Sequence, residues 1–203
     1  MLKVGLTGSI AVGKSFVSAV FIELACAVLD ADETARAVVA PGTVGWQQIV
    51  EVFGRDILNS DDSLNRAKLG TIVFANETKR AQLNAIVHPL IFAAQTDWLA
   101  AIEAKDPNAI AIIDAALLIE SGNYRKFDKI IVVWCEPEIQ LARLMKRNDL
   151  SAEDAARRVA AQMPQHEKKQ YADFLIETSN GFDDTRERTI QVYRSLKELT
   201  IKE

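Results

Sequence analysis

The chain has 203 residues, 49% of them hydrophobic and 26% charged, a composition typical of a globular protein that buries one core. Its formal net charge of −4 excludes a protein whose whole surface binds nucleic acid or anionic membrane. Any anion site must therefore be a local cluster of basic groups. The two cysteines, Cys26 and Cys135, lack a CxxC or Cys/His spacing, which predicts two reduced, buried thiols.

The sequence contains no evident signal that would target the protein away from the cytoplasm. No segment approaches the ~18 consecutive apolar residues that a membrane helix needs, and the N-terminus lacks the pattern of a signal peptide. We therefore expect a cytoplasmic protein with no nucleic-acid partner, no membrane and no obligate protein partner.

Five short apolar runs predict buried parallel strands, because they are continuous rather than alternating. They are "LKVGLT" (2–7), "CAVLD" (26–30), "AIAIID" (109–114), "KIIVVWC" (129–135) and "FLIET" (174–178). Helical patterns separate these runs, so the sequence predicts an α/β fold with a five-stranded parallel sheet.

Two connections are too long for simple crossovers. Residues 31–108 contain several helical stretches and no convincing strand, which predicts a helical insertion followed by a return helix. Residues 136–170 are helical and rich in charge, with "NDLS" (148–151) ending one helix and Ser151 capping the next.

The residues after the first predicted strand match the pattern G-x-x-x-x-G-K-[ST] from Gly8 to Ser15. Glycines let the backbone turn tightly so that successive N–H groups point at phosphate oxygens, and the following helix adds its positive end. Lys14 would then reach the β- and γ-phosphates, and the Ser15 hydroxyl would ligate Mg²⁺. A strand before and a helix after make a chance glycine turn a poor alternative, so we expect a nucleoside triphosphate site.

The motif indicates a nucleoside triphosphate but not the reaction. A GTPase would need N-K-x-D and D-x-x-G, and neither occurs in the sequence. A small kinase needs an acceptor site, a helical lid that carries arginines, and an acid near the acceptor hydroxyl. The sequence provides candidates for all three.

Acidic residues follow two of the predicted strands. Asp32 is expected at the carboxyl end of the second strand, where it could accept a hydroxyl proton or orient the hydroxyl for in-line attack. Asp30 is either a helix N-cap or a contributor near Mg²⁺. Asp114 ends the third strand, where a carboxylate would hold Mg²⁺ through water, with helix capping as the alternative.

The arginines of the 136–170 segment are candidates for a lid. Arg143 and Arg147 recur at i, i+4, and Arg157 and Arg158 follow the "NDLS" break. An arginine fork donates two parallel hydrogen bonds to phosphoryl oxygens, which favours this role over a solvated charged face, with Arg143 and Arg147 ahead. His88, in "AIVHPLIF", is more often packed than catalytic in such a setting.

These stretches together resemble the dephospho-CoA kinase family over nearly the whole chain. The P-loop alone is shared by many families, whereas "LDADETARAVVAPGT" followed by "FGRDIL" and "LNAIVHPLI" is far more specific. Further matching stretches are "LLIESG", "LARLMKRNDLSAEDAARRVAAQ" and "KKQYADFLIE".

The resemblance implies one P-loop kinase domain over 1–203, similar to the nucleoside monophosphate kinases, with a helical CoA-binding insertion at 31–88 and a lid at 139–165. The implied reaction is phosphorylation of the ribose 3′-hydroxyl of dephospho-CoA, with ATP as donor and Mg²⁺ as cofactor.

The resemblance also assigns residues. Asp32, Lys14 and Arg143 are the implied catalytic residues, and Ser15 and Asp114 the implied metal ligands. The implied ATP-binding set is Gly8, Ala11, Val12, Gly13, Lys14, Ser15, Phe16 and Arg147. The implied substrate-binding set is Asp32, His88, Asp114, Leu117 and Leu118.

The chain departs from the family pattern at three places. Family members usually read D-x-P-L-L-F-E where this chain has "DAALLIE", so Ala116 and Ile119 replace a proline and a phenylalanine. Phe16 stands where threonine is common, and Glu177-Thr178 replaces the usual aspartate–asparagine pair near the nucleotide base. The alternatives to dephospho-CoA kinase are a kinase of another nucleotide or small hydroxyl acceptor, and an ATP-binding regulatory module without turnover.

Overall fold

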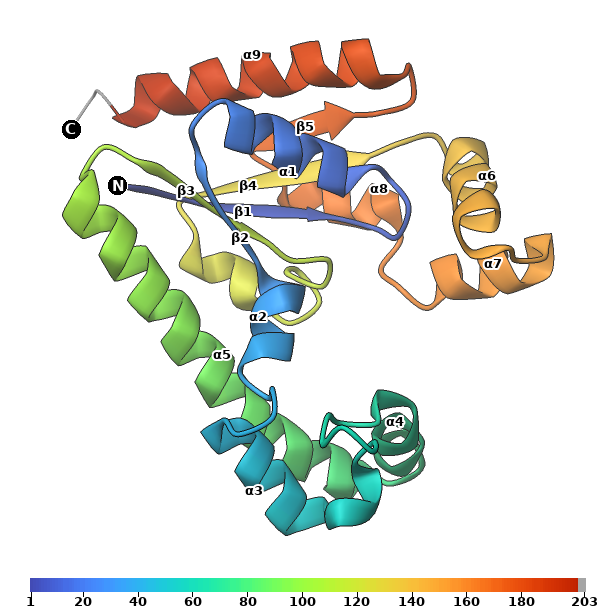
Figure 1. Ribbon diagram of the computed structural model, residues 1–203. Coiled ribbons are helices and arrows are strands. Elements are labelled where there is room, and N and C mark those ends of the chain that lie inside the picture. Colours follow the sequence, from blue (N-terminus) through green and yellow to red (C-terminus); the bar gives the residue numbers. More distant parts are fainter. Residues whose placement is uncertain (201–203) are drawn as a thin grey trace. The chain divides into compact units, whose positions relative to one another are not determined.

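The structure is a computed structural model that describes residues 1–200 of the chain (Figure 1). The contacts divide it into two compact units. The first comprises Met1–Leu29 and Ile102–Glu203, and the second Asp30–Ala101. The second unit thus runs beyond the predicted insertion at 31–88, because one continuous helix leads out of it.

The first unit is built on a parallel sheet, as the sequence predicts. Its strands are β1 (Leu2–Gly8), β2 (Ala27–Asp30), β3 (Ile110–Asp114), β4 (Lys129–Trp134) and β5 (Phe174–Glu177). The order across the sheet is β2-β3-β1-β4-β5. β1 pairs in parallel with both β3 and β4, so the carboxyl ends of β1, β3 and β4 lie at one edge.

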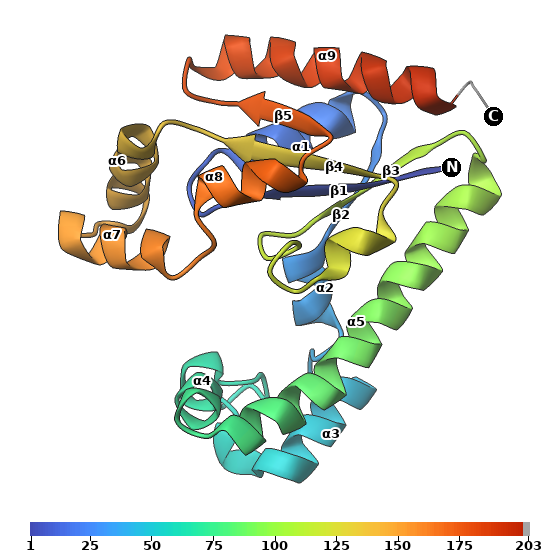
Figure 2. The same cartoon turned by 180° about the vertical axis from the view of Figure 1, so that it is seen from behind.

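Alternate residues of the central strands pack on opposite faces of the sheet, as a period of two requires. Ile131 and Val133 of β4 join the larger core cluster, whereas Ile130 and Val132 join a smaller one on the other face. Helices α1 (Lys14–Glu23) and α9 (Phe182–Thr200) lie side by side over the larger cluster, as both views show (Figures 1 and 2).

The segment after β4 forms short helices with a well-defined break. These are α6 (Pro137–Asn148), α7 (Ala152–Ala160), α8 (Gln165–Lys168) and the 3-10 turn η3 (Lys169–Tyr171). Asp149 ends α6 in the left-handed conformation at φ 50°, and the Ser151 side chain accepts a hydrogen bond from Asp154 N at 3.1 Å. The predicted break and the predicted Ser151 cap are both confirmed.

The second unit is entirely helical apart from an isolated bridge between Leu58 and Leu64. It contains α2 (Ala31–Ala37), α3 (Val44–Phe53), η1 (Arg55–Ile57), α4 (Arg66–Ala75) and most of α5 (Glu77–Lys105). Its own apolar cluster centres on Ile49, Ile57 and Leu69. The remaining connection of the first unit forms η2 (Asn123–Lys126).

Helix α5 is longer and more apolar than the sequence reading allowed. Among the described residues it is the one helix long and apolar enough to cross a membrane, judged by length and composition alone. Leu83, Ile86 and Val87 of α5 pack against the apolar cluster of the helical unit. This packing accounts for part of its apolar character without a bilayer.

Both cysteines are free and buried, as predicted. Burial raises the pKa of the Cys26 thiol to about 12, and it raises the pKa of Cys135 as well, although the nearby Arg143 opposes that shift. The thiolate is the reactive form, and a pKa of about 12 leaves on the order of 10⁻⁴ of Cys26 ionised at pH 8.

We therefore predict that native protein at pH 8 is not alkylated by iodoacetamide within an hour, whereas unfolded protein loses both thiols in minutes. Mass spectrometry of the intact chain measures the number of adducts. Rapid modification of either cysteine in the native state would contradict the buried placement.

Candidate active site

The loop between β1 and α1 has the backbone conformation of an anion-binding nest. Ala11 and Gly13 have left-handed φ values of 61° and 91°. Left-handed residues alternating with ordinary ones turn successive N–H groups toward a common centre. The loop ends at the N-terminus of α1, which has no side-chain cap, so the helix adds its partial positive charge to the same centre.

Gly8 fits this loop tightly against β4. A Cβ atom at Gly8 would lie 2.6 Å from the Val133 carbonyl oxygen and 2.8 Å from Val12 Cγ2, closer than real Cβ contacts. Gly13 combines its positive φ with a Cβ position 3.3 Å from Thr178 Oγ1. Packing therefore requires the first glycine of the motif, and the left-handed backbone conformation favours the second.

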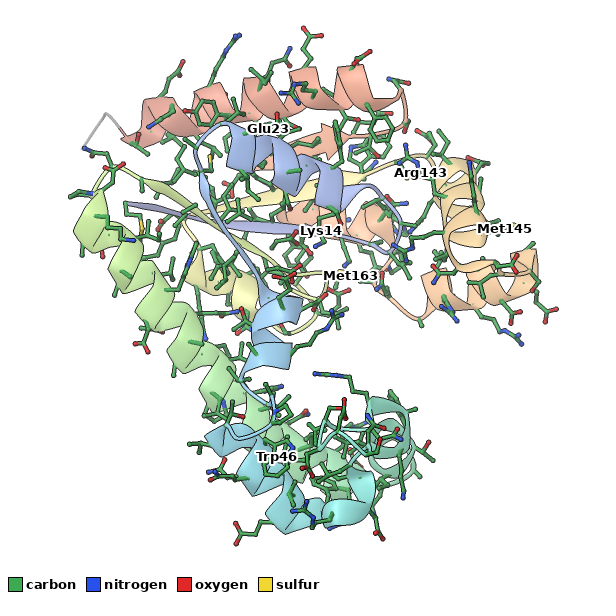
Figure 3. The ribbon with its side chains drawn as sticks, in the orientation of Figure 1. Lys14, Glu23, Trp46, Arg143, Met145 and Met163 are labelled. Carbon is green, nitrogen blue, oxygen red and sulfur yellow. The ribbon has the colours of Figure 1, made fainter. Side chains whose placement is uncertain are left out.

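Lys14, at the start of α1 (Figure 3), forms an ion pair with Asp114 at the carboxyl end of β3. The Asp114 side chain is only 5% exposed, and its other oxygen accepts a 2.6 Å hydrogen bond from Ser18 Oγ. Asp114 is therefore held by α1 rather than acting as a helix cap. The predicted lysine and carboxylate of the phosphate site are brought together.

The donor set fits a magnesium ion that arrives with a nucleotide. Among residues 1–200, no group of three or more His, Cys, Asp or Glu side chains is placed to hold a metal on its own. Mg²⁺ commonly keeps several waters and takes only one or two protein ligands plus substrate phosphates. The exposed Ser15 hydroxyl in the first turn of α1 and the Asp114 carboxylate match that requirement.

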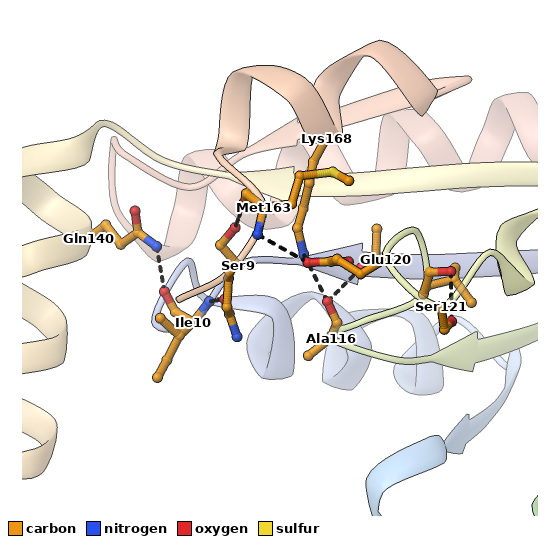
Figure 4. A network of polar contacts seen from close by, with 11 residues as sticks. Ser9, Ile10, Ala116, Glu120, Ser121, Gln140, Met163 and Lys168 are labelled. Atoms are coloured by element: carbon orange, nitrogen blue, oxygen red, sulfur yellow. Dashed lines mark hydrogen bonds and ion pairs between the residues drawn. The ribbon is translucent and has the colours of Figure 1, made fainter. Parts of the chain in front are cut away.

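Two glutamine side chains fix the orientation of the Ile10 peptide in the loop (Figure 4). Gln162 Oε1 accepts from Ile10 N at 2.8 Å, and Gln140 Nε2 donates to the Ile10 carbonyl at 2.8 Å. Gln140 is buried and also accepts from Gln165 Nε2 at 2.7 Å. Residues of the predicted lid segment thus hold the backbone of the phosphate loop.

A buried ammonium group ties the loop after β3 to the end of α8 (Figure 4). Lys168 is 0% exposed, and its Nζ donates to the Ala116 carbonyl and lies 2.9 Å from Glu120 Oε1. The Ala116 carbonyl also accepts from Thr7 Oγ1 at 3.2 Å. Glu120 Oε1 in turn accepts from Met163 N at 3.4 Å, so one carboxylate links the 115–121 loop to the end of the lid segment.

Arg143, on α6 (Figure 3), contacts the residue after β5 and, through it, the phosphate loop. Its two terminal nitrogens donate to Thr178 Oγ1 at 2.8 Å and to the Thr178 carbonyl at 2.7 Å. Thr178 Oγ1 donates to the Val12 carbonyl at 2.6 Å. Thr178 therefore connects Arg143 to the phosphate loop through hydrogen bonds.

The other arginines of this segment are placed differently. Arg147 is exposed, and its Nε donates to Asn148 Oδ1 at 2.9 Å. Arg157 pairs with Asp154 and lies 3.7 Å from Glu153 on the exposed surface of α7. The sequence analysis placed Arg143 and Arg147 ahead of the other two arginines, and of these two the structure anchors Arg143 on Thr178 and leaves Arg147 exposed.

The two leucines predicted at the substrate site differ in exposure. Leu117 is 53% exposed, whereas Leu118 is 3% exposed and belongs to the smaller apolar cluster of the sheet. The Leu118 side chain packs inside the loop, so any substrate contact from this dipeptide falls to Leu117.

Asp32 and His88 belong to the helical unit. Asp30 is the N-cap of α2, since its Oδ1 accepts from Asp32 N at 2.7 Å and from Glu33 N at 3.1 Å. The capping alternative for Asp30 is thereby confirmed. Asp32 is exposed in the first turn of α2, where it is two residues beyond β2.

His88 is exposed, contrary to the expectation of a packed histidine. Its ring lies 6.4 Å from that of Phe92, one helical turn further along α5. The apolar neighbours in the sequence, Val87 and Leu90, occupy other faces of the helix. An exposed ring with one edge contact is open to a ligand, which is compatible with the predicted substrate role.

The sequence reading missed Gln140 and Gln162, gave Lys168 no role in the site, and placed Thr178 near the nucleotide base without predicting its contacts with Arg143 and Val12. All four act on residues at least 35 positions away: Ile10, Ala116, Arg143 and Val12. A buried lysine in a short helix has no local signature. Glu120, an acid that follows the apolar stretch "ALLI", is a weak candidate for the site by sequence alone.

The fold and this site define a P-loop kinase. The shikimate kinase of Aquifex aeolicus shares the fold, with a TM-score of 0.51 at 15% identity over 96% of this chain and 97% of that one. A family model described as dephospho-CoA kinase matches residues 2–184. The chain belongs to the dephospho-CoA kinase family.

Individual relatives agree with this family. The dephospho-CoA kinase of Geobacillus kaustophilus is 45% identical over 95% of this chain and 96% of its own. The dephospho-CoA kinase of Streptomyces avermitilis is 43% identical over 97% of this chain and 94% of its own. Among solved structures, the dephospho-CoA kinase of Campylobacter jejuni has a TM-score of 0.73 at 28% identity, with 97% of each chain covered. A Thermus thermophilus protein reaches 0.82 at 26% identity, with 96% of each chain covered.

The Lys168–Glu120 pair generates a stability prediction. Glu120→Ala leaves a buried ammonium with only the Ala116 carbonyl, so we expect the free energy of unfolding to fall by about 2–4 kcal/mol. Glu120→Gln keeps an oxygen acceptor, so its free energy of unfolding should fall by less. Urea denaturation measures the free energy of unfolding of both variants.

The matched control is Glu77→Ala, which removes an exposed carboxylate paired with Arg80. Exposed ion pairs contribute little to the free energy of unfolding, so this variant should unfold at the same urea concentration as the parent protein. Equal stability of Glu120→Ala and Glu77→Ala would show that the buried pair does not hold the loop.

Proposed function

We propose that this protein transfers the γ-phosphoryl group of ATP to the 3′-hydroxyl of the dephospho-CoA ribose and so forms coenzyme A. The observation that carries the proposal is the P-loop nest with Lys14 on Asp114, in a chain of the dephospho-CoA kinase family. The fold alone would serve other kinases equally well.

In the proposed mechanism the loop amides and Lys14 neutralise charge on the phosphates. A nucleotide would draw Lys14 from Asp114 toward its β- and γ-phosphates. The freed carboxylate and the Ser15 hydroxyl would then hold Mg²⁺, which supplies charge neutralisation and phosphate orientation when it is bound. The glutamine contacts on Ile10 keep the nest formed while this exchange takes place.

Asp32 is proposed to accept the proton of the 3′-hydroxyl or to orient that hydroxyl for in-line attack. Its exposure in the first turn of α2 supports this role, since its side chain is open to a ligand. Asp30, which already caps the helix, is not available for the same task. We assign His88 and Leu117 to contacts with the acceptor on the basis of family resemblance and exposure.

Arg143 is proposed to stabilise the transferred phosphoryl group, and Arg147 to bind ATP. The anchoring of Arg143 on Thr178 supports the first assignment, because it places a fork-shaped donor next to the phosphate loop. Arg147 lies one turn further along α6 and is exposed, so its side chain is open to a ligand.

The reaction is tested by ADP release with and without an acceptor. We expect ADP only when dephospho-CoA is present, and formation of a product with one added phosphate at the 3′ position. Release with AMP or shikimate but not with dephospho-CoA would favour a kinase of another acceptor. Tight ATP binding without release for any acceptor would favour a regulatory module.

Asp32→Asn is expected to lower kcat by at least about 100-fold, because it removes the proposed base without changing the shape of the side chain. Glu33→Gln is the control, since Glu33 is the adjacent exposed acid in the same helical turn. Steady-state kinetics with both substrates measures the effect. Equal activity of the two variants would show that the acid has been misassigned.

Lys14→Ala should lower turnover by at least about 100-fold as well, since it removes a full charge from the phosphate site.

Arg143→Lys and Arg147→Lys should affect different kinetic constants. The first loses the bidentate fork and lowers kcat by roughly 10-fold or more, and the second mainly raises KM for ATP. A kcat effect confined to Arg147→Lys would reverse the two assignments.

A further inference from the structure

Two phenylalanine rings pack against each other beside the phosphate loop. The centroids of Phe16 and Phe182 lie 4.8 Å apart with the ring planes tilted by 51°. Phe16 directly follows Ser15 in α1, and Phe182 is the first residue of α9. Phe182 is 73% exposed, so most of its ring surface is not covered by protein.

The turn that presents Phe182 is well defined. Gly181 has a φ of 94°, which reverses the chain between β5 and α9. The Gly181 carbonyl then accepts from Thr185 N at 3.2 Å and from Thr185 Oγ1 at 2.7 Å. Both ribbon views place this turn at the same end of the sheet as the phosphate loop (Figures 1 and 2).

The direction of a bound nucleotide follows from the P-loop itself. The lysine reaches the β- and γ-phosphates, while loop amides hold the α- and β-phosphates. The α-phosphate therefore lies toward the start of α1, beyond Lys14. A nucleoside attached to it leaves the loop on the side of Ser15 and Phe16.

The polar groups near that exit are already engaged within the protein. Thr178 binds Arg143 through both its hydroxyl and its carbonyl, and its hydroxyl donates to Val12. The Glu177 carboxylate lies 3.7 Å from Arg188 Nη1. Edge recognition of a base by this dipeptide would have to break these contacts, whereas the exposed face of Phe182 has no competing partner of this kind.

We propose that Phe182, supported by Phe16, stacks on the base of the nucleotide held by the Gly8–Ser15 loop and provides most of the base affinity. The proposal rests on the proposed ATP-dependent function and names the residue that holds the base. Every base offers a flat π-face, so stacking supplies affinity with little discrimination between purines.

The test compares ATP with inorganic tripolyphosphate, which occupies the phosphate loop but has no base. Calorimetry with Mg²⁺ and the intact protein measures Kd for each. Phe182→Ala should raise Kd for ATP by about 5- to 100-fold, the range for one base–aromatic stack, and leave Kd for tripolyphosphate unchanged. Phe182→Tyr should bind ATP like the parent protein, because a stacking ring is retained.

Leu175→Ala is the matched control, since Leu175 is an exposed apolar residue of β5, 47% exposed, outside the phosphate site. It should change neither Kd. An unchanged ATP Kd in Phe182→Ala would overturn the stacking proposal and leave the proposed function intact. Equal losses for ATP and tripolyphosphate would also overturn it, because Phe182 would then support the loop itself. Failure of the parent protein to bind either ligand would instead refute the proposed function.

Discussion

The site depends on the backbone of the phosphate loop being held with its N–H groups inward. That conformation requires two left-handed residues, Ala11 and Gly13, and only one of them is a glycine. A left-handed alanine costs roughly 1–2 kcal/mol, so the surrounding structure must over-determine the turn. Gln140, Gln162 and Thr178 do this by binding the polar groups of Ile10 and Val12.

The same contacts join the loop to the rest of the first unit, which contains the sheet. Thr178 receives Arg143, and the segment that carries Gln162 continues to Met163, which binds Glu120. Glu120 and Lys168 then fix the turn that follows Asp114. The phosphate loop, the predicted lid segment and the end of β3 are therefore parts of one hydrogen-bonded network rather than three separate features.

Much of the first unit, which contains the sheet and the phosphate loop, could be predicted from the sequence, because its signals are local. A continuous apolar run specifies a buried strand, and Ser151 three residues before Asp154 specifies a helix cap. The P-loop pattern located Lys14 and Ser15 because spacing and flanking elements determine that turn. Asp114 followed from its position at the end of a strand, and the structure places it on Lys14.

Other features had no local signal. The contacts of Gln140 and Gln162 with Ile10 span 130 and 152 residues, and either glutamine in isolation resembles a surface residue. The helical insertion was expected to end at 88, yet α5 continues through Pro89 as a single helix and the unit extends to Ala101. His88 was expected to be packed because its neighbours are apolar, but helical periodicity places it on an exposed face.

The Lys14–Asp114 pair has a consequence for ligand binding. It sets opposite charges side by side at the phosphate loop, so the ammonium has a carboxylate as its counter-ion. Under the proposed function, a nucleotide that binds with its cation would replace this contact by a new ionic partner for each of the two groups. Breaking the pair would weaken nucleotide binding, but both groups would already lie at the site that binds the phosphates and the cation.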